Sequence, residues 1–327
     1  MREGEHGAPG APRWATLSAP GGRPGNEDRA GETATGAGHA FVVADGLGGH
    51  AAGELAAEAC VAAVCEALRA ERAFTPEALR AAFEAAQRAV LAAQARDPAA
   101  AGCRTTAVVL ALAGDRALWG HVGDSRLYLF RGGRVIHQTL DHSVPQALAQ
   151  SGAIRPSEIR AHPDRNRLLR SLGGEGEAEP ALLESPLALR PGDAFLLCTD
   201  GFWELVTEPE MEAALGEAKD PGDWLRRLER GLLAKARGEF DNYTATAVLP
   251  APLAGASRPG LPALVLGLAA ALAVALALGR CERKPAGYLL GSAAPAHELP
   301  LEAGSPGSSP GPGLHSAPGM PASARGV

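Results

Sequence analysis

Apolar runs alternate with amphipathic stretches over residues 13–249, and the two patterns predict strands and helices in turn. Strands are predicted at residues 39–44, 105–113, 117–122, 127–130, 134–136, 194–198 and 244–248. Apolar positions at steps of four predict a helix over residues 53–70, and Thr75-Pro76 predicts the start of a second helix that ends near residue 95. Hairpin strands in sequence, with helices inserted as a pair, are typical of antiparallel sheets covered by helices. The pattern therefore indicates an α+β domain.

The composition along the chain divides it into further zones. In order, these are a flexible lead-in at 1–12, the folded domain at 13–249, a linker at 250–260, an apolar segment at 261–278 and a tail at 279–327. The tail is rich in Pro, Gly and Ser and is predicted to be disordered.

The apolar segment at residues 261–278 is predicted to be a transmembrane helix. It lies within 21 uncharged residues that separate Arg258 from Arg280, and a helix of roughly 20 residues spans the hydrocarbon core of a bilayer. Arg280, Arg283 and Lys284 follow the segment, so the positive-inside count favours a cytosolic tail. The N-terminal residues lack the apolar region of a secretory signal, however. We therefore expect a single-pass protein of the inner cell membrane with its folded domain in the cytoplasm.

Charge and cysteine content exclude several classes of protein. The formal net charge is −6, which argues against nucleic acid as a partner. Five cysteines without any Cys-x-x-Cys pair argue against a disulfide framework and against a structural zinc site. Cys60, Cys65, Cys103 and Cys198 are expected to be reduced and buried, as in a cytosolic domain.

Acidic residues recur beside glycines at the ends of the predicted strands. Asp45 and Asp200 each follow a buried strand and precede a glycine, Asp124 follows the strand at 117–122, and Asp241 precedes the last strand. Taken singly, each motif reads as a turn, as Pro191-Gly192-Asp193 does. Several carboxylates that converge without a partner would repel one another, whereas Mg²⁺ or Mn²⁺ accepts such oxygen ligands.

The motifs together resemble the PPM (type 2C) family of metal-dependent protein phosphatases, in its bacterial form, across residues 13–249. They occur in the order Arg23-Pro24-Gly25-Asn26-Glu27-Asp28, Asp45-Gly46-Leu47-Gly48-Gly49-His50, Thr105-Thr106, Val122-Gly123-Asp124-Ser125-Arg126, Cys198-Thr199-Asp200-Gly201-Phe202-Trp203 and Asp241-Asn242-Tyr243-Thr244. The resemblance implies a four-layer αββα sandwich of two antiparallel sheets flanked by helices, with metal ions at one edge.

The resemblance also implies the role of each site residue. Two Mn²⁺ or Mg²⁺ ions would be held by a bridging Asp45 and by the remaining ligands, which are the Gly46 carbonyl, Asp200 and Asp241. Glu27 and Asp28 would hold metal-bound waters, Asp124 would bind a third and weaker ion, and Arg23 would bind the substrate phosphate.

The implied activity is that of a protein-serine/threonine phosphatase. A metal-bound hydroxide would hydrolyse phosphoserine and phosphothreonine on proteins, and the enzyme would oppose a membrane-linked serine/threonine kinase. Leu47 stands where many eukaryotic members have a histidine, so the general acid is unassigned. His50 and His121 are read as structural residues, His121 on the surface of a sheet.

Residues 141–173 resemble the flap of bacterial members. In this segment Arg165, Arg167 and Arg170 either hold phosphopeptides or form a solvated charged surface.

Two other functions remain open at this point. A pseudophosphatase that only docks phosphoproteins predicts the loss of Asp45, Asp200 or Asp241, and all three are present. A membrane anchor whose tail recruits partners is compatible with catalysis.

Overall fold

The structure, a computed structural model, describes residues 1–5, 11–49 and 51–252. The predicted membrane helix at 261–278, the tail at 279–327 and most of the linker lie outside the described residues. Within the described ranges, none of the helices is both long enough and apolar enough to cross a membrane.

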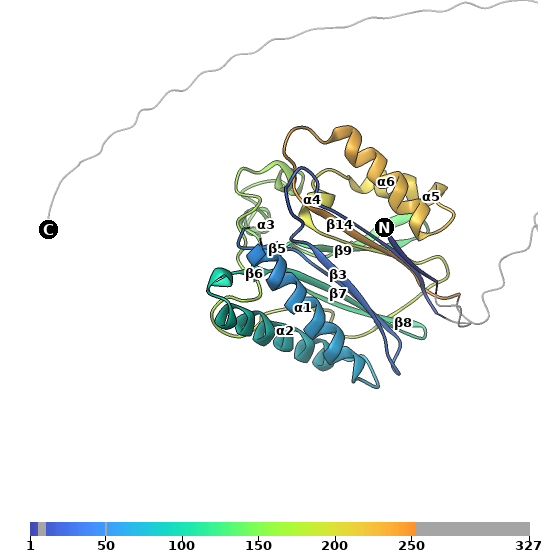
Figure 1. Cartoon of the computed structure of the whole chain (residues 1–327). Coiled ribbons are helices and arrows are strands. Elements are labelled where there is room, and N and C mark those ends of the chain that lie inside the picture. The colour runs from blue at the N-terminus through green and yellow to red at the C-terminus, as the bar shows by residue number, and fades with distance from the viewer. Residues whose placement is uncertain (6–10, 50, 253–327) are drawn as a thin grey trace, which may run out of the picture. The chain divides into compact units, whose positions relative to one another are not determined.

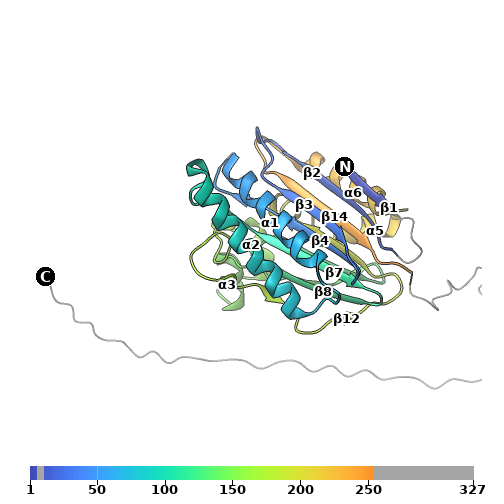
Figure 2. The same ribbon diagram turned by 60° about the horizontal axis from the view of Figure 1, so that its bottom comes forward.

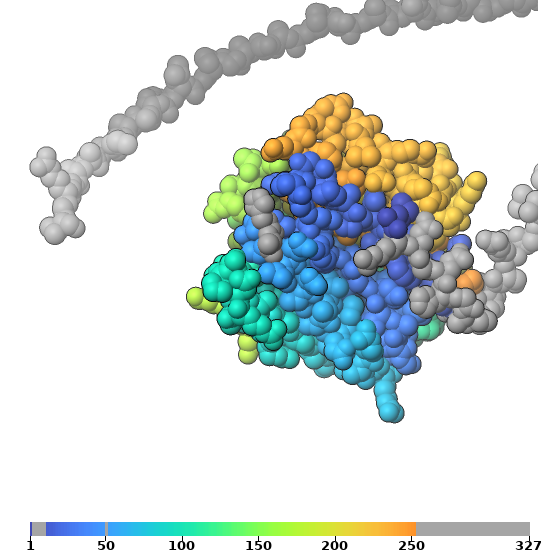
Figure 3. Space-filling view, viewed as in Figure 1, coloured from blue at the N-terminus to red at the C-terminus, as the bar shows by residue number. Residues whose placement is uncertain are grey.

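Two antiparallel sheets form the centre of the domain. The first has the strand order β1 (Arg2–Glu5), β2 (Arg13–Ala19), β14 (Tyr243–Leu249), β13 (Ala194–Cys198), β9 (Arg126–Arg131) and β10 (Arg134–Gln138). β14 pairs with β2 on one side and with β13 on the other, so the last strand lies inside this sheet. In Figure 3 the N-terminal residues in blue accordingly lie against the orange C-terminal part of the domain.

The second sheet lies face to face with the first. Its order is β11 (Ala181–Leu182), β8 (Arg116–Val122), β7 (Ala107–Ala113), β4 (His39–Ala44) and β3 (Arg29–Ala34), with β12 (Leu187–Ala188) also paired to β8. A short ladder joins β5 (Gly46–Leu47) to β6 (Arg104–Thr105). Most central strands are buried along their whole length, because both faces of each sheet are covered.

Helices cover the outer face of each sheet (Figures 1 and 2). The long pair α1 (Ala51–Arg69) and α2 (Pro76–Arg96) packs on the second sheet, and α5 (Glu208–Glu217) and α6 (Pro221–Lys235) pack on the first. The remaining helices are short: η1 (Pro98–Ala100), α3 (Val144–Gln150), η2 (Pro156–Ala161) and α4 (Asp200–Trp203). The predicted sandwich of two antiparallel sheets flanked by helices is confirmed.

Three apolar clusters separate the four layers. Leu68 and Phe83 belong to the cluster under α1 and α2, Phe41 and Leu197 to the cluster between the sheets, and Trp224 to the cluster under α5 and α6. The predicted helix start at Thr75 is confirmed, because its side chain accepts a hydrogen bond from the Ala78 N–H at 3.2 Å.

Two predicted elements differ from the structure. Part of the expected lead-in at 1–12 is instead the edge strand β1, because residues 2–5 pair with the otherwise open edge of β2. The strand predicted at 105–113 is broken at Thr106. There the Thr106 N–H donates to the Asp45 carbonyl at 2.9 Å, and the Thr106 hydroxyl accepts from the Asp45 N–H at 3.0 Å.

Candidate functional site

The ends of strands from both sheets meet at one edge of the sandwich. Asp45 follows β4 and Asp124 follows β8 of the second sheet, whereas Asp200 follows β13 and Asp241 precedes β14 of the first. A pocket of about 210 Å³ is lined by these four aspartates together with Arg23, Glu27 and Gly46. The structure therefore brings together every predicted site residue except Asp28. That residue is 1% exposed and lies behind the pocket.

Glycines allow the backbone to approach closely at this edge. A Cβ atom at Gly46 would overlap the carbonyl of Gly53, and one at Gly201 would overlap the carbonyl of Asn242. The glycine after Asp45 and the glycine after Asp200 are thus required by packing.

Asn242 holds the loop that carries Arg23 and Glu27. Its Oδ1 accepts from the Glu27 N–H at 2.8 Å, and its Nδ2 donates to the carbonyls of Gly25 at 2.8 Å and Pro20 at 2.9 Å. The sequence pointed to Asp241 in this motif, and the positioning role of its neighbour emerges only from the fold.

The clustered carboxyls share a raised affinity for protons. Burial, followed by the nearby Asp200, Asp28 and Asp124, raises the pKa of Asp45 well above its usual range. Burial and then Asp200 do the same for the pKa of Asp124. Burial raises the pKa of Asp28 to about 7, with Asp200 and Asp241 adding to it and hydrogen bonds from Thr244 and Thr199 opposing it. The charged forms repel one another, and their removal from water adds to the cost.

Hydrogen bonds within the cluster engage most of these carboxyls. Arg23 Nη2 lies 3.1 Å from Asp241 Oδ2, the Asp45 and Asp200 side chains are hydrogen-bonded to each other, and the Thr199 hydroxyl donates to Asp28 Oδ2 at 2.9 Å. With the side chains placed in this way, no three acidic, histidine or cysteine side chains in the described ranges form a ready-made metal site.

The donor set nevertheless fits a hard divalent cation. Five carboxylates line the pocket, and Asp28 Oδ1 is buried without a hydrogen-bond partner. Oxygen donors of this kind are what Mg²⁺ and Mn²⁺ prefer, and a buried acceptor without a donor is costly. A cation in the pocket would relieve the repulsion that raises the carboxyl pKa values.

Residues 141–173, which we call the flap segment, border the acidic pocket. Asn166 and Leu168 line the pocket, and the sequence did not single out either of them. Arg165 Nε lies 2.6 Å from Glu204 Oε1, on the residue that follows α4. Burial, together with Asp200 and against Arg165, raises the pKa of Glu204 to about 7. The ion pair ties the flap segment to the helix that begins at Asp200.

The predicted flap arginines have different surroundings. Arg165 is tied to Glu204, whereas Arg167 pairs with Asp164 at 3.4 Å and Arg170 with Glu179 at 3.3 Å, both on the surface. Exposed pairs of this kind are held weakly.

A buried ion pair lies beneath the flap segment. The Arg126 guanidinium donates to both carboxylate oxygens of Asp141 at 2.8 and 2.7 Å, and these side chains are 5% and 1% exposed. The guanidinium also lies 3.5 Å from the centroid of the Trp203 ring, and Trp203 Nε1 donates to the Asp124 carbonyl at 3.0 Å. The pair thus links the start of the flap segment to the backbone of Asp124.

The structure tests the predictions made for His121 and for four of the cysteines. His50 lies outside the described residues. His121 lies on a sheet face as predicted, but it is only 4% exposed because the flap segment covers it. Cys60, Cys103 and Cys198 are free and buried, and Cys65 is free and partly exposed. No histidine occurs among the described residues that line the acidic pocket, and Leu47 does line it.

Comparison with known proteins gives a consistent set of relatives. A protein-family profile described as protein phosphatase 2C matches residues 24–218. The chain is 36% identical over 205 residues to the serine/threonine protein phosphatase PstP of Mycobacterium tuberculosis. The matched region covers 62% of this chain but only 39% of the length of PstP. It is 30% identical over 230 residues to the protein phosphatase PhpP of Streptococcus pneumoniae, covering 69% of this chain and 92% of PhpP.

Solved structures agree in fold. The crystal structure of the M. tuberculosis phosphatase PstP matches with a TM-score of 0.65 and 34% identity, over 73% of this chain and 98% of that one. The catalytic domain of PstP in complex with two manganese ions matches with a TM-score of 0.63 and 33% identity, over 73% of this chain and 97% of that one.

Proposed function

Because this chain belongs to the protein phosphatase 2C family, we propose that it hydrolyses phosphoserine and phosphothreonine on proteins with the help of divalent metal ions. The observation that carries the proposal is the pocket in which Asp45, Asp124, Asp200 and Asp241 meet Arg23. Members of this family use Mn²⁺ or Mg²⁺, and the PstP catalytic domain has been seen with two manganese ions.

The residues that would hold the metals are those of the acidic pocket. Asp45, Asp200, Asp241 and the Gly46 carbonyl would bind two Mn²⁺ or Mg²⁺ ions directly. When bound, the ions would lower the pKa of a water molecule and neutralise charge on the phosphate. To act as ligands, Asp45 and Asp200 would have to release to solvent the proton that they share in their hydrogen bond.

The remaining acids would support this centre. Glu27 and Asp28 are proposed to act through water molecules, and Asp28 Oδ1 offers the unused acceptor for one of them. Asp124 is proposed as a ligand of a third, weaker ion, because it lines the same pocket beside Asp45 and Asp200.

Arg23 is the cation best placed to bind the substrate phosphate. Its side chain is 53% exposed at the mouth of the pocket, and its partner Asp241 is also partly exposed. Since an exposed ion pair contributes little, Arg23 can exchange Asp241 for a phosphoryl group, which a planar guanidinium binds with two parallel hydrogen bonds.

The proposal is tested by measuring phosphate release from a phosphothreonine peptide by the full-length protein. Release is expected with Mn²⁺ and is expected to stop with EDTA and in Asp241→Asn. The matched control is Asp115→Asn, since Asp115 is 70% exposed and its ion pair with Arg116, at 3.7 Å, lies on the surface. A folded protein that binds Mn²⁺ but releases no phosphate would overturn the proposal and favour a phosphoprotein-binding role.

The membrane link is part of the same proposal. Residues 261–278 are proposed to anchor the enzyme in the inner membrane, with the catalytic domain in the cytoplasm, where it would oppose a membrane-linked serine/threonine kinase. The support is the run of 21 uncharged residues (259–279), since a bilayer is spanned by roughly 20.

Cys281 stands two residues after the end of this run, and its labelling reports the side of the membrane on which the tail lies. In intact cells stripped of their outer envelope, a membrane-impermeant maleimide is expected to label the wild type but not Cys281→Ser. Labelling only after the membrane is permeabilised would place the tail inside, as the charge count favours. Recovery of the protein in the soluble fraction would contradict the anchor.

A further inference from the structure

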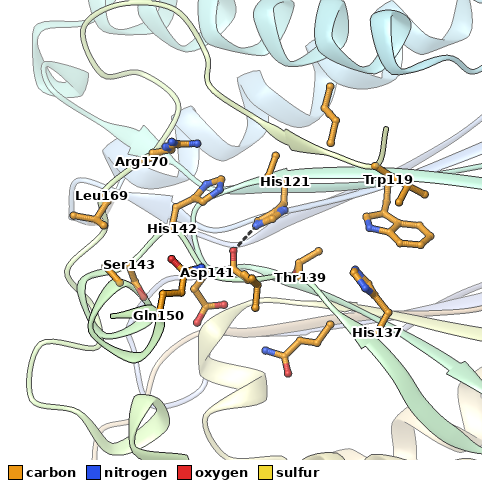
Figure 4. A pocket seen from close by; sticks show the side chains of 16 residues that line it. Trp119, His121, His137, Thr139, Asp141, His142, Ser143, Gln150, Leu169 and Arg170 are labelled. Atoms are coloured by element: carbon orange, nitrogen blue, oxygen red, sulfur yellow. Dashed lines mark hydrogen bonds between the residues drawn. The ribbon is translucent and has the colours of Figure 1, made fainter. Parts of the chain in front are cut away.

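A second cavity lies on the far side of the flap segment from the predicted catalytic residues. Its volume is about 450 Å³, and it is bounded by β8, β10, α3 and residues 181–183 (Figure 4). The volume falls within the range of roughly 300–1,000 Å³ typical of small-molecule sites. None of the predicted catalytic or metal-binding residues lines it, so the proposed phosphatase activity leaves this cavity unexplained.

Flat, uncharged rings form its inner wall. The Trp119 and His137 rings lie 5.0 Å apart at one end, and the His121 and His142 rings are stacked at 4.6 Å with an angle of 17° at the other (Figure 4). Burial lowers the pKa of all three histidines, that of His142 to about 3, so the imidazoles are neutral near pH 7. Leucines 182 and 183 complete an apolar surface. A planar aromatic group matches such a wall in shape and polarity.

One cation lies at the rim. Among the described residues that line the cavity, Arg170 is the one Arg or Lys. Its partner Glu179 is 70% exposed and stands 3.3 Å away, and Arg170 itself is 46% exposed, so the pair exchanges readily for another anion. The other charged lining residue, Asp141, is fully engaged by Arg126. An anionic ligand would thus meet an available guanidinium and no competing free carboxylate in the described lining.

We propose that this cavity is a regulatory binding site for a small planar aromatic molecule that carries one carboxylate. The ring system would lie against Trp119 and the stacked imidazoles, and the carboxylate would bind Arg170.

Hydrogen bonds connect the cavity to the acidic pocket. His142 Nδ1 accepts from the Gly123 N–H at 3.2 Å, and the His142 N–H donates to the Gly123 carbonyl at 2.9 Å. Gly123 immediately precedes Asp124. The Leu169 N–H donates to the His142 carbonyl at 2.8 Å, and its neighbour Leu168 lines the acidic pocket. A ligand that moves His142 therefore acts on Asp124 and on the pocket wall together.

Gly123 has little freedom to absorb such a movement. Its φ is +97°, and a Cβ there would overlap the side chain of Thr106. Thr106 in turn is hydrogen-bonded to the backbone of Asp45. The regulatory effect rests on the proposed phosphatase activity, whereas binding does not.

The test is calorimetric titration of the full-length protein with 1-naphthoate and with its uncharged counterpart 1-naphthamide. The carboxylate is expected to bind about tenfold more tightly. Arg170→Gln should remove that preference, whereas Arg116→Gln, a surface residue on the same strand as Trp119 but outside the cavity, should keep it. Ala147→Phe, at an exposed position that lines the cavity, should weaken both ligands.

Saturating 1-naphthoate is further expected to change phosphate release from the peptide by about fivefold. No binding, equal affinity for the two probes, or an unchanged preference in Arg170→Gln would overturn the site. Binding with unaltered phosphate release would overturn its regulatory role. Binding by a protein that releases no phosphate under any condition would support the site and contradict the proposed function, so the two failures are distinguishable.

Discussion

Replacing Asp45 with asparagine is expected to stabilise the metal-free protein while it lowers phosphate release on the order of 10³-fold. In EDTA the melting temperature should rise by about 2–4 °C, the shift that ~1 kcal/mol produces in a domain of this size. With Mn²⁺ the wild type should have the higher melting temperature, since it gains stability from the bound ion and the variant gains less. Differential scanning fluorimetry in EDTA and in Mn²⁺, beside the peptide assay, measures all three effects.

The physical reason lies in the crowding of the carboxyls. Asp45 is hydrogen-bonded to Asp200, and its pKa is raised by burial and by the charges of Asp200, Asp28 and Asp124. An asparagine amide can donate the same hydrogen bond without ever ionising, so the repulsion is removed. A residue kept for function at a cost in stability is a common property of active sites.

The same carboxyls determine how the metal-free protein responds to pH. An unfolded aspartate titrates near 3.9, whereas burial raises the pKa of Asp28 to about 7 and raises that of Asp45 as well. Below the pKa of the unfolded state, the carboxyls are protonated in both states and this stability is fully present. It is lost as the pH rises through the higher pKa of the folded state, because the buried carboxyls then ionise and repel one another. In EDTA, the free energy of unfolding should therefore fall from pH 5 to pH 8, and less steeply in Asp45→Asn.

Asp193→Asn is the matched control for these experiments. Asp193 is also buried, but Arg131 donates to both its carboxylate oxygens at 2.8 and 2.7 Å. Loss of this paired charge should lower the melting temperature with and without Mn²⁺. If Asp45→Asn behaved in the same way as Asp193→Asn, carboxylate repulsion would not be the dominant electrostatic effect in the acidic pocket.

Breaking the Arg126–Asp141 pair should have the largest effect on stability. Arg126→Met leaves the Asp141 carboxylate buried with no cation, which costs about 3–5 kcal/mol and lowers the melting temperature by roughly 10 °C. Phosphate release should fall as well, because Trp203 holds the Asp124 carbonyl and packs under the same guanidinium. Chemical denaturation at constant Mn²⁺, together with the peptide assay, gives both quantities.

A double replacement separates the charge effect from packing. Arg126→Met with Asp141→Leu should recover most of the lost stability, because no unpaired charge remains. Arg69→Met is the surface control, since Arg69 and Glu66 are 56% and 77% exposed and such pairs contribute at most about 1 kcal/mol. If Arg126→Met were as stable as Arg69→Met, the buried pair would not hold the flap segment.

Strong local signals explain why much of the fold was predictable. The strand predicted at 39–44 is β4, and that at 194–198 is β13, because fully buried strands appear as continuous apolar runs. β3 was missed because its sequence RAGETA has no apolar run, and the strand forms through its pairing with β4. α6 was missed too, although its Asp220 cap, Pro221 start and spaced leucines carry a helical signal.

The site also contains residues that the sequence could predict and residues that it could not. Asp45, Asp200 and Asp241 could be found because each stands beside a strand end in a recognisable motif. Asn166 and Leu168 could not, because their position depends on how the flap segment folds over the pocket. The cavity beside His142 was likewise invisible, since it is enclosed by residues from distant parts of the chain.

The place of β14 in the first sheet has a consequence for biosynthesis. β14 lies between β2 and β13, so β2 has no partner towards the sheet centre until the ribosome has passed Leu249. Asp241 and Asn242 are likewise made only just before that point. On the metal-binding roles proposed for Asp241 and its partners, a nascent chain that carries Arg23, Asp45 and Asp200 is expected to be inactive, and phosphate release is expected to appear only when the final strand is inserted.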